Sequence, residues 1–165
     1  MADGTREIEH KFLVRVERLP DAARTGGARL TQGYLSFVPS VRVRVSETIE
    51  IGGGAGGPET KAWLTIKGPG VIERAEYEYE IPTAHAREML GLCAATLTKT
   101  RRRVPVGAHT WDVDEFTGSH AGLWLAEVEI SAQGEDFERP PWLGEEVSKD
   151  GRYANGALAR AGRAP

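Results

Sequence analysis

Residues 5–14 read TREIEHKFLV, a run in which charged and mostly apolar side chains alternate. Successive side chains of an extended chain point to opposite faces. One face of this segment would carry Glu7, Glu9 and Lys11. The other would carry Ile8, His10 and Phe12. The period of two therefore predicts a β-strand with one ionic and one packed face.

The same alternation recurs along most of the 165 residues, most cleanly in VRVRV at 41–45. Further strands are predicted at 28–38, 61–67, 71–81, 95–106, 109–117 and 122–131. Together they make eight mostly antiparallel strands, a number that can close into a barrel with a bore for a small ligand. The fold class is therefore α+β, an eight-stranded antiparallel β-barrel or tunnel with a few short flanking helices. We expect a single domain over residues 1–165.

The segments between the strands read as short helices and turns. Thr83 is expected to cap a short helix over AHAREMLG, and a second helix is expected from about Tyr153. Residues 49–60, with five glycines and a proline, are expected to form a hairpin loop. The four tryptophans, Trp63, Trp111, Trp124 and Trp142, are expected to pack in the core or in a lid rather than to stack on a ligand.

The ionic faces of the predicted strands are segregated by sign. Acidic pairs spaced by one residue occur in EIE, EYE, DVD and EVE, and basic pairs in RVR and KTR. Any single strand of this kind could be the wet face of an ordinary sheet. Like charges two residues apart repel, however, so the whole set predicts that a charged ligand lies between the strands.

The residue types indicate which ligand that is. Clustered Arg and Lys suit phosphate oxygens, and clustered carboxylates without His or Cys suit Mg²⁺ or Mn²⁺. The chain has one cysteine, Cys93, and four scattered histidines, so a thiolate or imidazole metal site finds no support. Phosphoryl transfer needs mainly positioning and charge neutralisation, which such a lining supplies.

Composition argues against several other classes of protein. The 21 basic and 24 acidic residues give a net charge of −3, unlike an unselective nucleic-acid binder. No apolar run approaches the ~20 residues that span a bilayer, and the N-terminal MADGTREIEHK is charged. We therefore expect a cytoplasmic protein with neither nucleic-acid nor membrane partners. The oligomeric state stays open, a homodimer being one option.

The opening EIEHK resembles the ExExK signature of the CYTH family, also called triphosphate tunnel metalloenzymes. Further motifs follow in the family's order: QGYL at 32–35, RVR at 42–44, LTIKG at 64–68, RAEYEYEIP at 74–82, TKTR at 98–101, WDVDEF at 111–116, AEVEI at 126–130 and PPWLGEEVSKDGRYAN at 140–155. The resemblance covers essentially the whole chain. It is greatest to the compact bacterial inorganic triphosphatases.

The resemblance implies roles for individual residues. The implied metal ligands, for two Mg²⁺ or Mn²⁺ ions, are Glu7, Glu9, Asp114, Glu127 and Glu129. The implied phosphate contacts are Lys11, Arg42, Arg44, Lys67, Arg74, Lys99 and Arg101. The implied catalytic set is Glu7, Glu9, Lys11, Glu76 and Glu78. Asp112 departs from the family's more usual Glu, and Arg103 and Arg152 receive no assigned role.

Three functions are compatible with these residues. The first is metal-dependent hydrolysis of inorganic triphosphate to pyrophosphate and phosphate. The second is a class IV-type adenylate cyclase, or a nucleoside or thiamine triphosphatase, on the same scaffold. The third is a non-catalytic polyphosphate-binding protein. The pairs of carboxylates favour an enzyme over the third, because binding a polyanion alone would be better served by fewer carboxylates.

Overall fold

The computed structural model describes residues 6–49 and 59–165. Its strands are β1 (Arg6–Val14), β2 (Gly27–Phe37), β3 (Ser40–Ile49), β4 (Thr60–Lys67), β5 (Glu73–Glu80), β6 (Ala95–Val106), β7 (His109–Phe116), β8 (Trp124–Glu129) and β9 (Leu143–Glu146). Its α-helices are α1 (Thr83–Leu92) and α2 (Asn155–Ala161). Its 3-10 turns are η1 (Val16–Arg18), η2 (Asp21–Ala23), η3 (Gly118–His120) and η4 (Gly151–Tyr153). Most of the glycine loop predicted at 49–60 lies outside the described residues.

Strand β1 closes the barrel. The strands pair in the order β5-β4-β3-β2-β6-β7-β8-β1, and β1 pairs again with β5. All of these pairings are antiparallel, so the eight-stranded antiparallel barrel is confirmed. On its second edge, β1 gives residues 6–8 to β5 and residues 12–14 to β9. Strand β9 was not predicted, because the Pro-Pro segment before it reads as loop.

The apolar faces of the strands point outward and are covered by flanking segments. Phe12, Trp111 and Val128 are almost fully buried in a cluster that includes Leu19, Ala23 and Trp142 from η2 and the neighbouring loops. Val43 and Val45 pack beneath Ala86 of α1. The packed face predicted from the alternation is therefore the outer face of the barrel, and the charged face is left to line the bore.

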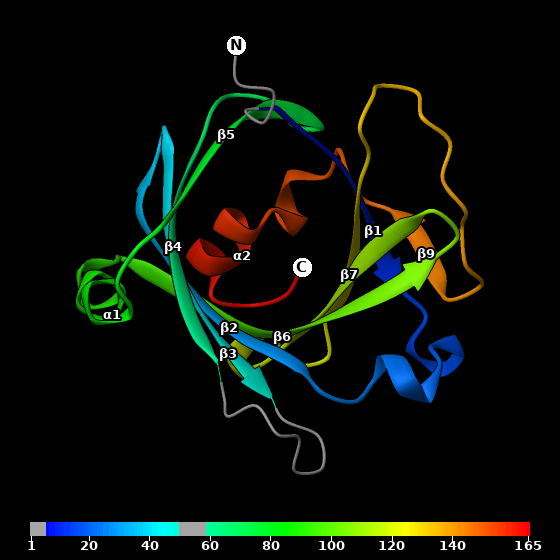
Figure 1. Cartoon of the computed structure of the whole chain (residues 1–165), viewed down its shortest axis with the longest axis horizontal. Helices are drawn as coiled ribbons and strands as arrows, with labels where there is room; N and C mark the ends of the chain where they lie inside the picture. Colours follow the sequence, from blue (N-terminus) through cyan, green and yellow to red (C-terminus); the bar gives the residue numbers. More distant parts are fainter. Residues whose placement is uncertain (1–5, 50–58) are drawn as a thin grey trace.

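Helix α2 lies inside the ring of strands and fills one end of the bore (Figure 1). Its Leu158 is fully buried against Tyr34, Leu97 and Phe116. The side chain of His120 makes a 2.8 Å hydrogen bond from Nε2 to the carbonyl oxygen of Leu158. The sequence predicted a helix here but not its position within the barrel.

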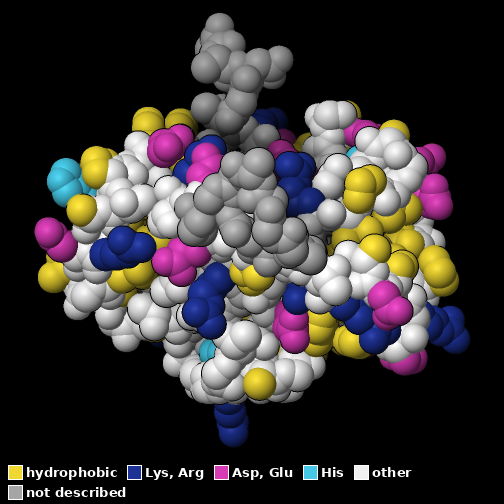
Figure 2. Space-filling view, turned by 60° about the horizontal axis from the view of Figure 1, so that its bottom comes forward, with side chains coloured by type: hydrophobic (Ala, Val, Ile, Leu, Met, Phe, Trp, Pro, Cys, Tyr) yellow, Lys and Arg dark blue, Asp and Glu magenta, His cyan; other side chains and the backbone are white. Residues whose placement is uncertain are grey.

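Two smaller expectations are wrong. Thr83 is the first residue of α1, not its cap: Pro82 occupies the cap position without a side-chain hydrogen bond. The alternation also predicts that Tyr77 and Tyr79, on the face of β5 opposite Glu76 and Glu78, are packed, but they are about half exposed, at 44% and 56%. No described helix is long and apolar enough to span a membrane. On the face drawn in Figure 2, basic and acidic side chains are interspersed.

Candidate functional site

The bore contains a cavity of about 220 Å³ lined almost wholly by charged side chains. Its basic lining residues are Arg42, Arg44, Lys67, Arg74, Arg101 and Arg103. Its acidic lining residues are Glu7, Glu9, Glu76, Glu78, Asp112, Glu127 and Glu129. Thr110 and Asn155 complete the lining. Lys11 lines an adjoining cavity beside α2 that shares Arg42, Lys67 and Arg74 with the first. The fold thus brings together most of the residues that the sequence singled out.

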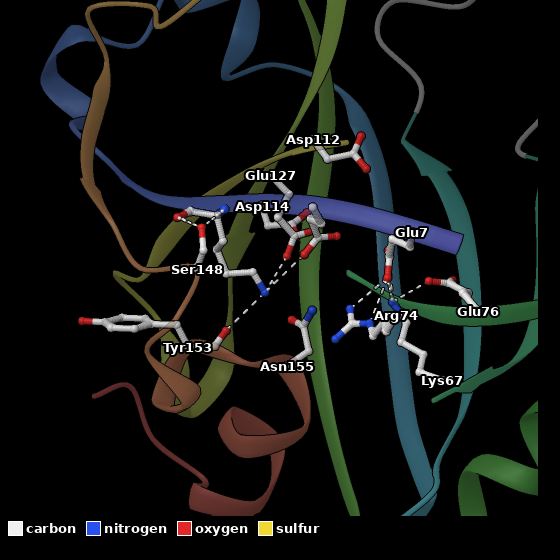
Figure 3. Close-up of polar contacts among 12 residues, drawn as sticks. Glu7, Lys67, Arg74, Glu76, Asp112, Asp114, Glu127, Ser148, Tyr153 and Asn155 are labelled. Atoms are coloured by element: carbon white, nitrogen blue, oxygen red, sulfur yellow. Dashed lines mark hydrogen bonds and ion pairs between the residues drawn. The ribbon is translucent and has the colours of Figure 1, made fainter. Parts of the chain in front are cut away.

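Glu7 is held between two cations on the β4–β5 side of the tunnel (Figure 3). Lys67 Nζ donates to Glu7 Oε2 at 2.9 Å, and Arg74 Nε donates to the same oxygen at 3.0 Å. Lys67 Nζ is also 2.8 Å from Glu76 Oε2. Burial acts to raise the pKa of Glu76, but its hydrogen bond with Glu7 and the charge of Lys67 outweigh burial and lower it. Lys67 is therefore shared between Glu7 and Glu76 and favours the charged form of Glu76.

Glu127 is the centre of a second cluster. Lys11 Nζ lies 2.9 Å from Glu127 Oε1, and Arg101 Nη2 donates to Glu127 Oε2 at 2.7 Å. Burial acts to raise the pKa of Glu127, but Lys11, Lys99 and Arg101 together hold it well below its usual range. The pKa of Lys11 rises despite burial, because Glu127 and Glu9 favour its charged form. Both groups are therefore charged at neutral pH.

Lys99 and Asp114 are on the bore-facing side of β6 and β7 and are buried near α2. Lys99 is 1% exposed and Asp114 is 0% exposed. The two are joined at 2.5 Å, and Arg101 donates to both oxygens of Asp114 at 2.7 Å. Burial lowers the pKa of Lys99 to about 8, against the attraction of Asp114. Neither residue lines the described cavities; Asp114 contacts the lining residue Arg101, and Lys99 contacts Asp114 and the lining residue Asn155.

Two arginines of β3, Arg42 and Arg44, line the charged cavity close to Glu78. Arg44 Nη2 donates to both oxygens of Glu78, at 3.3 and 3.2 Å. Burial and then the neighbouring Arg42 lower the pKa of Arg44 to about 10. Arg42 is 3.6 Å from the same carboxylate. The fully buried Thr65 links the two, accepting from Arg42 at 3.3 Å and donating to Glu78 at 2.8 Å.

Glu9 and Glu129 form the part of the lining with excess negative charge. They face each other across the β1–β8 ladder, where like charges destabilise a sheet. Burial and Glu127 raise the pKa of Glu9, whose cation Lys11 is 3.7 Å away. Partial burial raises the pKa of Glu129, and Glu7, Glu76 and Glu9 add to the effect.

A divalent cation would relieve this repulsion. Within residues 6–49 and 59–165, no three His, Cys, Asp or Glu side chains form a preassembled metal centre. Mg²⁺, however, is commonly bound by only one or two carboxylates together with water and substrate phosphates. The carboxylate oxygens of Glu9 and Glu129 therefore fit a hard cation that arrives with its substrate.

Three residues of the site were not predicted: Thr110 and Asn155, which line the cavity, and Thr65, which contacts two lining residues. Asn155, the first residue of α2, lines the cavity and accepts from Lys99 Nζ at 3.2 Å. Thr65 orders Arg42 and Glu78, as described above. Asn155 ends the PPWLGEEVSKDGRYAN motif, which was its only signal. Arg152, which follows the same motif's Asp150, pairs with that residue outside the tunnel and is 70% exposed.

The fold and site together define a closed antiparallel barrel whose bore is lined by cationic side chains and carboxylates. The CYTH domain family model matches residues 5–157, and the chain belongs to that family. An inorganic triphosphatase of Acetivibrio thermocellus is 39% identical over 160 residues, 94% of each chain. One from Nitrosomonas europaea is 36% identical over 93% of this chain and 96% of the relative.

A solved structure also supports the assignment to this family. A crystal structure described as an inorganic triphosphatase superposes with a TM-score of 0.59, at 30% identity over 93% of each chain. The resemblance inferred from the sequence motifs is therefore confirmed.

Proposed function

We propose that this protein hydrolyses inorganic triphosphate to pyrophosphate and phosphate inside its tunnel, with Mg²⁺ or Mn²⁺. The observation that carries the proposal is the lining of the bore, which combines six basic residues with seven carboxylates around one cavity. Both curated relatives described above are inorganic triphosphatases. A triphosphate with bound divalent cations would neutralise both sets of charges at once.

The cations of the wall would bind and orient the phosphate chain. Arg42, Arg44 and Arg101 would contact phosphate oxygens through paired hydrogen bonds. Lys11, Lys67 and Arg74 would contact them from the other side of the tunnel, the two lysines as point charges. All of these groups have carboxylate partners in the free protein, so substrate would exchange those partners for phosphate. Lys99 would act through Asp114 and Arg101.

The carboxylates would hold the cations and order water. We assign two divalent ions to the acidic lining, with Glu7, Glu9, Glu127 and Glu129 as ligands and Asp114 supporting them through Arg101. The ions would neutralise phosphate charge and lower the pKa of a bound water. Glu76 and Glu78, which already hold Lys67 and Arg44, would fix those cations and orient the attacking water.

The test of the proposal is product release from tripolyphosphate, ATP, thiamine triphosphate and pyrophosphate, each with Mg²⁺ and with Mn²⁺. We expect tripolyphosphate to exceed ATP about tenfold in kcat/KM, a difference of ~1.4 kcal/mol in transition-state binding. The reason is that the lining of the charged cavity matches the phosphate chain, which is the part of the substrate that reacts. Better turnover of ATP, or conversion of ATP to cyclic AMP, would favour the nucleotide enzymes instead.

If carboxylates bind the divalent cation, the rate of hydrolysis should depend on both the cation and the pH. Excess EDTA should abolish activity, because the carboxylate ligands act only through the cation. The raised pKa values of Glu9 and Glu129 keep these groups protonated at pH values where an ordinary glutamate, near 4.5, is ionised. The rate should therefore fall with decreasing pH while still above 4.5.

Protons and metal compete for the same oxygens, so roughly tenfold more Mg²⁺ should move the acid limb to lower pH. The measurement is a set of rate–pH profiles at two Mg²⁺ concentrations. Activity that survives EDTA, or an acid limb that ignores Mg²⁺, would contradict metal binding by these carboxylates.

A further inference from the structure

A buried histidine joins the barrel to the helix inside it. His120 belongs to η3, in the connection between β7 and β8, and is 3% exposed. Its Nε2 lies 2.8 Å from the carbonyl oxygen of Leu158 in α2. A carbonyl oxygen can only accept, so Nε2 carries a proton, and Nδ1 of the neutral ring is then an acceptor. Ser119 Oγ lies 3.3 Å from Nδ1 and can donate to it. The imidazole is therefore held in one tautomer with its donor aimed at α2.

Helix α2 depends on the barrel for its position. It is seven residues long, and isolated helices of that length are unstable in water. Leu158 packs in an apolar cluster, and Arg160 lies over the ring of Phe37, 4.9 Å from its centroid. Within residues 6–49 and 59–165, the contact with His120 is the only hydrogen bond between the backbone of α2 and the barrel. Because apolar packing is non-directional and a hydrogen bond is directional, His120 determines how far α2 enters the bore.

The first residue of the same helix contacts the site. Asn155 lines the charged cavity, and its Oδ1 accepts from Lys99 Nζ at 3.2 Å. Lys99 is joined to Asp114, which accepts from Arg101 of the lining. Asn155 is three residues from the Leu158 carbonyl, or about 4.5 Å along a helix. A displacement of α2 at that carbonyl would therefore separate Asn155 from Lys99.

We propose that His120 is a positioning residue for triphosphate hydrolysis, because it holds α2 where Asn155 meets Lys99. The inference rests on the proposed function, since it names the reaction that the position of α2 affects. His120 itself lines neither the charged cavity nor the cavity that contains Lys11, so it acts only through α2. The last group in this series of contacts is Arg101, a proposed phosphate contact. Loss of the His120 hydrogen bond should therefore weaken substrate binding more than it slows turnover.

Two substitutions of His120 separate its hydrogen bond from its bulk. His120→Phe keeps a ring beside Phe116, whose centroid is 6.3 Å from that of the imidazole, but has no donor. His120→Gln loses the ring but keeps an N–H donor. With Mg²⁺ and tripolyphosphate, we expect His120→Phe to raise KM at least fivefold and to change kcat less than twofold. His120→Gln should keep KM within twofold of the wild-type value. If His120→Phe does not fold, His120→Leu replaces it, because leucine is smaller and also lacks a donor.

His109→Phe is the matched control. His109 is a partly buried histidine of β7 whose Nε2 lies 2.7 Å from Glu135 Oε1, and it lines neither cavity of the bore. The same substitution there removes an imidazole contact without touching α2, so KM should not change. A double-mutant cycle with Asn155→Ala tests the route. If His120 acts through Asn155, adding His120→Phe to Asn155→Ala should change KM less than twofold, because the contact is already lost.

Hydrogen–deuterium exchange tests the anchoring of α2 without using activity. The amides of residues 155–161 should exchange faster in His120→Phe than in the wild type or in His120→Gln, while those of β2 and β3 keep their rates. Wild-type KM in a folded His120→Phe protein, equal rises in KM for Phe and Gln, independent effects in the double mutant, or unchanged exchange of α2 would each overturn the inference. Failure of the proposed function has a different signature, namely no phosphate release from tripolyphosphate by the wild type.

Discussion

Glu9→Gln should lower kcat for tripolyphosphate by about 100-fold, the scale of losing one group that stabilises transition-state charge. The change keeps the shape of the side chain but removes a charge that would bind the cation. Stability should not fall, and at neutral pH it should rise slightly. Burial and Glu127 raise the pKa of Glu9, so its ionised form opposes folding once the pH exceeds that raised value. Turnover and thermal unfolding of the same preparation measure both effects.

Two controls separate the bore from the outer wall. Glu115→Gln removes a carboxylate that pairs with Arg102 outside the tunnel, at 2.9 Å, and should leave the rate unchanged. Val43→Ala removes apolar contacts under α1 and should cost about 1–3 kcal/mol of unfolding free energy with a near-normal rate. If Glu9→Gln stays fully active, the charged face has no role in catalysis and the proposed function is wrong.

Lys99→Met should destabilise the protein by about 3–5 kcal/mol, as expected when one partner of a buried ion pair is removed. Methionine fills the space of the lysine stem but leaves the fully buried Asp114 with only Arg101. The released carboxylate would also let Arg101 shift, so KM should rise in the fraction that folds. Urea unfolding followed by steady-state kinetics measures the two effects in turn.

Lys61→Met is the matched surface change. Lys61 pairs with Glu59 at 2.8 Å in solvent, so its loss should leave stability and rate unaltered. A Lys99→Met protein as stable as the wild type, with only KM raised, would mean instead that Lys99 contacts phosphate directly. That outcome would restore the role assigned from the TKTR motif.

Most of the barrel could be predicted because one physical rule acts on every strand. Alternation puts Glu7 and Arg44 on one face and Ile8 and Val43 on the other, whatever the strands pair with. The same alternation directs Glu127, Lys11 and Arg101 into the bore, so they meet there once the barrel closes. The local sequence was therefore enough to predict the fold class and most of the residues that line the bore.

The features that could not be predicted depend on contacts between segments that are distant in the sequence. Nothing near Lys99 indicates that Asp114 and α2 exclude it from solvent, since its alternation matches that of Arg101. Strand β9 pairs with β1 although its own sequence, LGEE, has little strand character. Asn155 reaches the cavity only because α2 enters the bore. Burial and helix placement of this kind are tertiary effects, which local patterns do not record.

The pairing of β1 also constrains the order in which the barrel folds. Glu9 is aligned with Glu129, so β1 must wait for the synthesis of β8 before this ladder can form, although its other edge can pair earlier with β5. Contacts so remote in sequence slow folding, and synthesis at ~5–20 residues per second adds several seconds of delay. The strand that waits carries Glu7, Glu9 and Lys11. The charged lining that β1 shares with β8 would thus be completed only when the barrel closes, and we expect a chain truncated before β8 to lack activity.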